Sequence, residues 1–279
     1  MTEASTAAVT AEPTNTRQIA DEAFAAFNSG GQHVESFSAR YPALNLSDAY
    51  RATALINARR VAEGYKPAGR KVGFTNHDMW NKYGVRAPIW GYVYDRTIHD
   101  PTSPLPLAPY TEPKIEPEIM FGLASAPSPG MDDAAVLSCI AWVAHGFEIV
   151  QSIFPNWTFS AADTVVADAL HGALLIGRRL EIGTRMQEWL HTLREFEVEL
   201  YCDGELVERG NALNVLEGPL SAVRHLVNLL ALDPDNAPLA AGEIISTGTL
   251  TLARSVSPGE LWTTKLKGIE LEGVSLRLC

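Results

Sequence analysis

The 279-residue sequence has little of what marks secreted, membrane or nucleic-acid-binding proteins. It has only three cysteines, with no short spacing between them, so neither a disulfide framework nor a zinc site is expected. No run approaches the ~20 apolar residues of a membrane span, and residues 1–13 lack the basic and apolar segments of a secretion signal. Basic residues number 22 against 33 acidic ones, and the formal charge of −11 repels phosphate backbones. We therefore expect a cytoplasmic protein with no membrane and no nucleic-acid partner.

Several motifs that hold cofactors or nucleophiles are also missing. The sequence contains no glycine-rich dinucleotide or phosphate loop, no G-x-S-x-G turn and no H-E-x-x-H helix. Nucleotide binding, serine hydrolysis and zincin chemistry therefore have no support in the sequence. Candidate chemistry has to be sought among the carboxylates, lysines and histidines.

What is present is an ordinary globular composition, 46% hydrophobic and 20% charged. Residues 1–13 are expected to form a disordered tail and residues 14–68 a small helical N-terminal region. Residues 69–279 are expected to form a β-rich core, so the predicted fold class is α+β. Strands are predicted at residues 70–75, 89–94, 115–123, 141–150, 195–202, 243–247, 250–253, 261–266 and 271–278. A loop is expected after the first strand, through Asn81.

The segment Glu116-Pro117-Glu118 carries two carboxylates two residues apart. In a strand, such residues point to the same face, roughly 6 to 7 Å apart along the chain. Like charges so placed are tolerated in water or around a cation. Pro117 cannot donate to a ladder, which places this strand at an edge or at a bulge. A solvated acidic face is the alternative interpretation of the pair.

Glu148 favours the cation. It lies in the apolar run 140–150, which predicts a buried strand. A carboxylate in such a strand has to be neutralised, hydrogen-bonded or metal-bound, because an unpaired buried charge costs several kcal/mol. Three carboxylates with few histidines or thiols nearby favour Mg²⁺ or Mn²⁺, completed by waters and substrate oxygens.

Six short motifs occur in the order seen in one enzyme family. They are K-V-G-F-T at Lys71–Thr75, E-P-E at Glu116–Glu118, F-E-I-V at Phe147–Val150, A-D at Ala167–Asp168, P-L-S-A-V at Pro219–Val223 and S-T-G-T at Ser246–Thr249. Together they resemble the 2-keto-4-pentenoate hydratase and 4-oxalocrotonate decarboxylase family, within the fumarylacetoacetate hydrolase superfamily. The resemblance runs from about Ala20 to the C-terminus.

The resemblance implies a mixed β-roll core with Mg²⁺ or Mn²⁺ held by the three glutamates. It implies a small-molecule 2-oxo acid substrate that chelates this metal, a place in aromatic catabolism, and a homo-oligomer. Lys71 matches the family's catalytic lysine. Thr247 and Gly248 match the segment that receives the substrate carboxylate.

The sequence also departs from the family's pattern around the expected pocket. Ile89 stands where hydratases of this family usually carry an acid, which is closer to the decarboxylase branch. Ser152 follows a stretch that has lost an acid, and it is kept as a candidate substrate contact. His171 replaces a family serine, and it joins Asp168 as a candidate proton carrier.

These observations predict a divalent-metal-dependent lyase acting on a 2-hydroxydienoate or 2-oxo-alkenoate. The first prediction is a hydratase, with Lys71 assisting tautomerisation before water adds. Alternatives are a decarboxylase of a vinylogous 2-oxo diacid, and a C–C hydrolase or tautomerase of the same superfamily. A different class, an inactive binding or scaffold protein, is disfavoured by the intact lysine and glutamates.

Overall fold

The computed structural model describes residues 15–29 and 32–279, so the expected tail at residues 1–13 lies outside the described residues. The helices are α1 (Thr16–Phe27), α2 (Phe37–Arg40), α3 (Leu46–Ala62), α4 (His77–Tyr83), α5 (Asp133–Ser138), α6 (Ala161–Val166), α7 (Met186–Glu195) and α8 (Pro219–Ala231), with 3₁₀ turns η1 (Asp95–Thr97), η2 (Pro155–Trp157), η3 (Asp168–Leu170) and η4 (Ala212–Asn214). The strands are β1 (Pro67–Gly73), β2 (Ile89–Tyr94), β3 (Ile98–His99), β4 (Lys114–Leu123), β5 (Ile140–Val150), β6 (His171–Ile176), β7 (Leu180–Glu181), β8 (Glu197–Cys202), β9 (Glu205–Asn211), β10 (Ile244–Thr249), β11 (Arg254–Ser255), β12 (Leu261–Lys267) and β13 (Ser275–Arg277).

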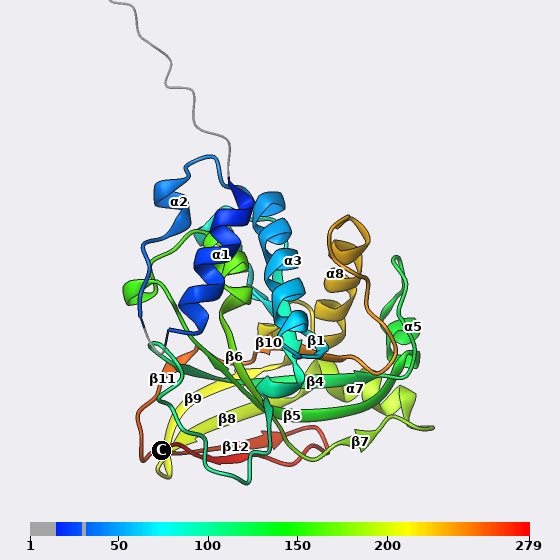
Figure 1. Ribbon diagram of the computed structural model, residues 1–279. Coiled ribbons are helices and arrows are strands. Elements are labelled where there is room, and N and C mark those ends of the chain that lie inside the picture. Colours follow the sequence, from blue (N-terminus) through cyan, green and yellow to red (C-terminus); the bar gives the residue numbers. More distant parts are fainter. Residues whose placement is uncertain (1–14, 30–31) are drawn as a thin grey trace, which may run out of the picture.

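Two sheets form the body of the protein. The large mixed sheet has the order β2-β1-β10-β4-β5-β6-β3, with parallel pairing of β1 to β10 and of β3 to β6. The small sheet, β13-β12-β8-β9, is antiparallel and forms the lower layer in Figure 1. The α+β fold with a mixed β-sheet core, predicted from the sequence, is confirmed.

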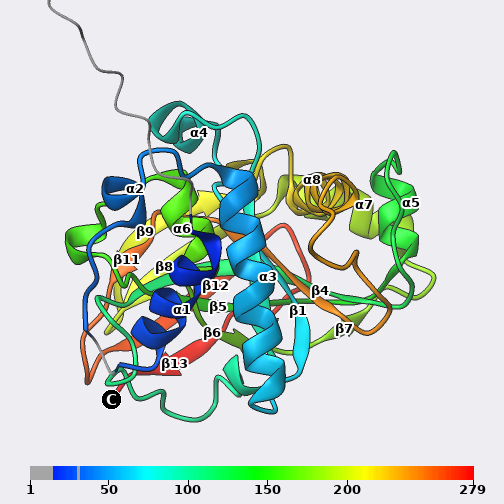
Figure 2. The ribbon, with the colours of Figure 1, turned by 45° about the horizontal axis from the view of Figure 1, so that its top comes forward.

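The N-terminal helices α1 and α3 pack directly against α6. Small side chains on the inner faces of α1 and α3, such as Ala23 and Ala52, are fully buried and allow close approach. They share a hydrophobic cluster with Val165 of α6 and with Ile89 of β2. Figure 2 shows α1 and α3 next to each other, in front of the sheets. This packing fixes the segment that leads from α6 into η3.

β4 is an interior strand, paired with β10 on one side and β5 on the other. Of the two positions that Pro117 allowed, the sheet edge is therefore wrong and the bulge is right. The register of β10 shifts opposite this point, between Ser246 and Thr249. The Pro117 carbonyl accepts a hydrogen bond from the Leu250 amide, so the missing N–H faces the irregular side of the ladder. The proline thus costs the sheet no regular hydrogen bond.

Three predicted elements differ from the structure. Residues 77–83, expected in a loop, form α4, because the Asn76 side chain caps its start and left-handed Gly84 ends it. Residues 250–253 are not a strand, since the Thr249 hydroxyl accepts from the Thr251 amide and donates to its carbonyl. The predicted final strand, residues 271–278, is reduced to β13.

Candidate metal centre and active site

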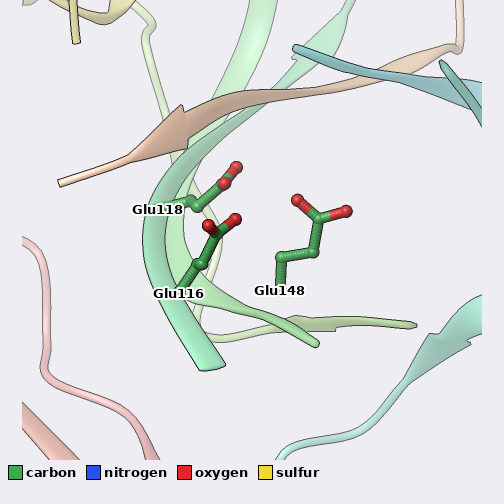
Figure 3. Close-up of side chains that lie close together, drawn as sticks. All are labelled: Glu116, Glu118 and Glu148. Atoms are coloured by element: carbon green, nitrogen blue, oxygen red, sulfur yellow. The ribbon is translucent and has the colours of Figure 1, made fainter. Parts of the chain in front are cut away.

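Three carboxylates from two neighbouring strands meet at one point. Glu116 and Glu118 lie on β4 and Glu148 on β5, and the register places Glu116 directly opposite Glu148. One oxygen of each lies within 4.8 Å of the others. Figure 3 shows the three side chains turned toward a common point. The alternation expected for the E-x-E pair is therefore present, and its carboxylates do not form a solvated acidic face.

The centre is buried and contains an unpartnered oxygen. Glu118 and Glu148 are fully buried, and Glu116 is half-buried. Glu118 Oε1 has no hydrogen-bond partner among the described residues, and the nearest cation to Glu148 Oε2 is the Lys71 ammonium, at 3.2 Å. Burial, with the other two carboxylates adding to it, raises the pKa of Glu118 well above its ordinary value. Burial also raises the pKa of Glu116 to about 7. A hard divalent cation would coordinate the unpartnered oxygen and relieve the repulsion among the three carboxylates. These residues therefore fit a cation such as Mg²⁺.

The other oxygen of Glu118 is fixed by the end of β10. Gly248 N donates to Glu118 Oε2 at 3.0 Å, and the Ser246 hydroxyl donates to the same oxygen. Gly248 has φ +103°, and a Cβ there would lie 2.2 Å from the Thr75 hydroxyl oxygen. Only glycine therefore brings this backbone amide to the carboxylate. Glu118 is oriented with one oxygen held and one presented to the centre.

Glu148 is oriented by a histidine. His171 Nδ1 lies 2.8 Å from Glu148 Oε1, and His171 Nε2 lies 2.8 Å from the hydroxyl of Thr97. An ionised carboxylate only accepts, so Nδ1–H donates at this contact. His171 is 5% exposed and is absent from the pocket wall described below. It therefore holds a carboxylate of the centre, and its role as a proton carrier stays a prediction.

Lys71 brings a positive charge to the centre from β1. Its Nζ donates to the Ala169 carbonyl at 3.0 Å and lies 3.2 Å from Glu148 Oε2. Burial alone would lower the pKa of Lys71, but Glu148, Glu116 and Glu118 outweigh it and raise this pKa. Reciprocally, burial opposes ionisation of Glu148, yet Lys71 and His171 keep its pKa below the ordinary value. Lys71 is thus an ammonium and Glu148 a carboxylate.

The turn that accepts from Lys71 is held in a left-handed conformation. Asp168, Ala169 and Leu170 have φ values of 54°, 50° and 65°, each costing roughly 1 to 2 kcal/mol for an ordinary residue. The Tyr92 amide donates to Asp168 Oδ1 at 2.7 Å and anchors the turn to β2. Gly91 lets the turn approach, since a Cβ there would lie 2.2 Å from the Asp168 carbonyl oxygen. Strain of this kind persists where the surrounding structure fixes it, and here it aims a carbonyl at Lys71.

A cavity of about 450 Å³ opens from this centre to the surface. Lys71 and Glu116 lie on its wall, and so does Ile89, which is 2% exposed. Much of the remaining wall is aromatic or aliphatic, contributed by Phe74, Tyr83, Trp157, Phe159 and Leu170. Tyr83 stacks on Phe74 with ring centroids 4.5 Å apart. The pocket has a charged inner end and an apolar middle.

Other predicted site residues lie close to the centre but bond to the protein itself. The Thr247 hydroxyl donates to the Ile119 carbonyl at 2.9 Å. The Ser152 hydroxyl donates to the Phe154 carbonyl at 2.7 Å. Neither residue lines the pocket, and neither does Gly248 or Asp168. Their direct contact with substrate stays a prediction.

The comparisons with known proteins agree with this geometry. No family model matches the chain. Over 231 residues, 82% of this chain and 84% of its relative, the sequence is 31% identical to the 4-oxalocrotonate decarboxylase of Pseudomonas sp. strain CF600. The chain belongs to the 4-oxalocrotonate decarboxylase and 2-keto-4-pentenoate hydratase family. The hydratase of Paraburkholderia xenovorans LB400 is 28% identical over 258 residues, 92% of this chain and 93% of the relative.

Solved structures extend the family likeness to the whole fold. The 4-oxalocrotonate decarboxylase from Pseudomonas putida G7, complexed with magnesium and adipate, superposes with a TM-score of 0.86 at 29% identity. The match covers 96% of this chain and 99% of that one. The fumarylpyruvate hydrolase from Pseudomonas aeruginosa shares the fold alone, with a TM-score of 0.54 at 14% identity over 75% and 88% of the two chains. The predicted family, an enzyme family with structures that hold divalent metals, is confirmed.

Sequence reasoning missed several residues of this hydratase–decarboxylase site. Ser246 was within reach, because it opens the S-T-G-T motif that identified the family. Thr97 carries no signal in the sequence, since it lies 74 positions from the histidine that it contacts. Lys82 and Lys114 line the pocket; α4, which carries Lys82, was expected to be a loop.

Proposed function

We propose that the protein is a divalent-metal-dependent lyase acting on a 2-hydroxydienoate or its 2-oxo-alkenoate tautomer. The observation that carries the proposal is the convergence of Glu116, Glu118 and Glu148 beside Lys71 at the inner end of the pocket. The relatives named as decarboxylase and hydratase support the reaction class. The structural relative complexed with magnesium supports Mg²⁺, with Mn²⁺ as the alternative.

In this proposal Glu116, Glu118 and Glu148 hold the cation. When bound, the cation supplies a Lewis acid that withdraws electrons from the 2-oxo group of the substrate. His171 and Ser246 keep two of the three carboxylates in place. Lys71 keeps its ammonium beside the 2-oxo end, where it stabilises the negative charge of the dienolate and exchanges a proton with the substrate carbon.

Water addition is the first candidate reaction. It requires that water reach the conjugated alkene, which would lie in the middle of the pocket. Loss of CO₂ from a vinylogous diacid is the second candidate, and one observation favours it. Ile89 puts an apolar side chain on the wall where hydratases of this family usually carry an acid, so a carboxylate that would handle the added water is missing there.

A substrate panel tests the proposal. We expect Mg²⁺-dependent loss of the dienol ultraviolet band with at least one 2-hydroxydienoate, and chelation should abolish it. Product analysis then separates added water from released CO₂. Metal-independent turnover, or no turnover of any 2-hydroxydienoate or 2-oxo-alkenoate, would contradict the proposed function.

Lys71→Met tests the role of the lysine. Met keeps the unbranched stem, so β1 should still pack. Because the three glutamates hold the metal in this proposal, Mg²⁺ affinity should change little while kcat falls roughly 10²- to 10⁴-fold. Deuterium exchange at C3 of the substrate should slow in parallel with turnover. Exchange at the wild-type rate would assign the proton to another group, with His171 and Asp168 as the candidates.

The proposal includes a cytoplasmic enzyme of aromatic catabolism that forms a homo-oligomer. All three cysteines are free, which suits a reducing compartment. No helix in residues 15–29 or 32–279 has the length and apolarity to cross a membrane. Since β4 is interior, its proline no longer supports assembly, and the oligomer rests on the family likeness alone. Light scattering that gives a 30.3 kDa particle at micromolar concentration would contradict it.

A further inference from the structure

Four aromatic residues line the pocket away from the three glutamates. This aromatic wall consists of Phe74, Tyr83, Trp157 and Phe159. All four side chains are only half-buried, whereas aromatic residues of the core, such as Phe147 and Phe154, are fully buried. Contiguous apolar surface around a cavity is typical of ligand-binding grooves. The aromatic wall is therefore a candidate for contact with a ligand.

The rings of the aromatic wall contact one another and the core. The planes of Phe74 and Tyr83 are 12° apart, and those of Tyr83 and Phe159 are 17° apart with centroids at 5.8 Å. The Trp157 ring lies 6.1 Å from that of Phe159. Phe74, Trp157 and Phe159 also pack against the hydrophobic cluster that contains Phe154. Rings held in this way have little freedom to move, so the wall is preorganised for a ligand.

Two residues of the aromatic wall have a strained backbone. Phe74 and Trp157 both have φ +55°, a left-handed value that is an outlier for a bulky side chain. The Trp80 indole donates to the Phe74 carbonyl at 2.7 Å, and the Trp157 indole donates to the Glu112 carbonyl at 3.1 Å. Strain of this kind persists at ligand contacts, where the surrounding structure over-determines it. Core packing alone does not require it, so the strain indicates that the position of these two rings is itself important.

The cavity is also larger than a short dienoate requires. Its volume of about 450 Å³ lies in the range of pockets that enclose drug-sized ligands. In the proposed function, the 2-oxo acid group occupies only the inner end, beside the glutamates. The space along the aromatic wall is then left for a larger apolar part of the substrate.

We propose that the aromatic wall is a subsite for an aryl group, at the end of the substrate distal to its 2-oxo acid group. The inference rests on the proposed function, which places the 2-oxo acid at the glutamates. It narrows the substrate class to 2-hydroxydienoates and 2-oxo-alkenoates that carry an aryl group on the last carbon of the chain. Such a substrate has no distal carboxylate to lose, so it fits water addition, the first candidate reaction. A flat ring is favoured over a saturated one, because stacked and edge-on contacts between aromatic rings add to the effect of burial.

Binding of three matched acids to the Mg²⁺-loaded protein, measured by calorimetry, tests the subsite. The acids are 2-oxohexanoate, 6-phenyl-2-oxohexanoate and 6-cyclohexyl-2-oxohexanoate, which share the 2-oxo acid group and chain and differ at the last carbon. We expect the wild-type protein to bind the phenyl acid about 30-fold more tightly than 2-oxohexanoate, the effect of burying roughly half of a phenyl ring. The phenyl acid should also bind more tightly than the cyclohexyl acid.

Two variants remove rings from the aromatic wall. Trp157→Leu keeps an apolar side chain but removes the flat ring, so it should lose most of the preference for the phenyl acid. Tyr83→Leu should lose part of it, and because α4 has no buried residue, this variant leaves the core intact. In both variants the affinity for 2-oxohexanoate should be unchanged.

Tyr201→Leu is the matched control. Tyr201 is half-buried and has Lys265 Nζ 4.7 Å from its ring centroid, much as Trp157 has Lys114 Nζ at 3.9 Å, but Tyr201 lies outside the pocket. This variant should therefore bind all three acids as the wild type does.

Three results would overturn the aryl subsite alone. They are equal wild-type affinity for the phenyl acid and 2-oxohexanoate, a cyclohexyl acid that binds at least as tightly as the phenyl acid, and a preference that survives both Trp157→Leu and Tyr83→Leu. If none of the three acids binds with Mg²⁺, the proposed function fails, and the subsite fails with it.

Discussion

Glu148 and Glu118 are both fully buried, yet the surroundings stabilise the negative charge of Glu148 and destabilise that of Glu118. Glu148 is compensated by Lys71 and His171, whereas Glu118 faces two other carboxylates with only neutral donors beside it. The raised pKa of Glu118 and the lowered pKa of Glu148 express this difference. Burial by itself therefore does not decide which glutamate destabilises the metal-free protein.

Substitution by glutamine should separate the two residues. Without metal, Glu118→Gln should change the free energy of unfolding by less than about 1 kcal/mol, because it removes a repelled charge and keeps an acceptor. Glu148→Gln should destabilise by about 3 kcal/mol, since it leaves the Lys71 ammonium buried beside a neutral amide. Denaturant unfolding in chelator measures both values, and titration with Mg²⁺ should show weakened binding in each variant. Equal destabilisation of the metal-free variants would contradict this account of the charges.

His145 gives the protein a predictable response to acid. Its Nδ1 bonds the Glu118 carbonyl and its Nε2 the Thr264 hydroxyl, each at 2.9 Å. Burial lowers the pKa of His145 to about 4, below the unfolded value near 6.5. Between these values the unfolded chain binds more protons, so stability rises with pH through this window and is lost as pH falls through it.

The contribution of His145 should amount to at most about 3 kcal/mol. His145→Gln lacks a group that titrates there, so the difference in unfolding free energy between wild type and variant should shrink as pH falls from 6.5 to 4. Chemical denaturation across this range, in chelator, provides the measurement. A difference that stays constant with pH would mean that His145 does not stay neutral in the folded protein.

At the scale of elements, sequence patterns identified the strands that carry the centre. They did not predict the sheet register or the turn at residues 168–170 that orient its side chains. Alternation in β4 and the apolar run of β5 predict strands with the right faces, because both strands are long and regular. The pairing of Glu116 with Glu148 depends on sheet register, which one strand alone does not specify. The left-handed turn at residues 168–170 has no glycine to announce it. Its conformation comes from contacts with β1 and β2, so tertiary structure overrides local preference there.

The close approach of this turn to β2 should make Gly91 intolerant of any side chain. Gly91→Ala drives a Cβ to 2.2 Å from the Asp168 carbonyl oxygen, and we expect a loss of at least about 2 kcal/mol of stability. The displaced turn should also withdraw the Ala169 carbonyl from Lys71 and lower turnover. Thermal unfolding and steady-state kinetics on the same preparation would show both effects.

Gly84→Ala is the matched control for this prediction. Gly84 is left-handed, with φ +65°, but a Cβ there meets nothing within 4 Å. It should cost about 1 kcal/mol from the backbone alone and leave kcat unchanged. Similar losses of turnover in the two variants would show that the approach of the turn to β2 is not what matters.

At the scale of the whole molecule, the strands that carry the three glutamates also join the hydrophobic clusters. β4 contributes Ile119 to the cluster under α5, α7 and α8, Ile115 to the cluster between the two sheets, and Met120 to a third cluster. Local loss of the centre would therefore disturb packing in several parts of the protein at once.

Metal binding should consequently stabilise the chain as one unit. At a concentration ~100 times its Kd, Mg²⁺ adds about 2.7 kcal/mol to the free energy of unfolding. For a chain of this size that corresponds to a rise in Tm of roughly 5 °C. Scanning calorimetry should show one transition moving upward with Mg²⁺, and a smaller shift for the variant Glu118→Gln at the same Mg²⁺ concentration. Two transitions, of which only one moves, would show that the centre is not coupled to the rest of the core.

The separation of the pocket into an inner end on interior strands and a mouth on α4 and loops has a consequence for how such an enzyme diversifies. Lys82 lies on α4, whereas the three glutamates lie on β4 and β5, and the two groups have only the cavity between them in common. A substitution at Lys82 therefore leaves the glutamate centre in place. New substrate preferences can therefore arise at the mouth while the three glutamates are inherited unchanged. Lys114 is different, since it shares β4 with two of the glutamates. We expect directed evolution toward other substrates to accumulate changes in α4 before any in β4.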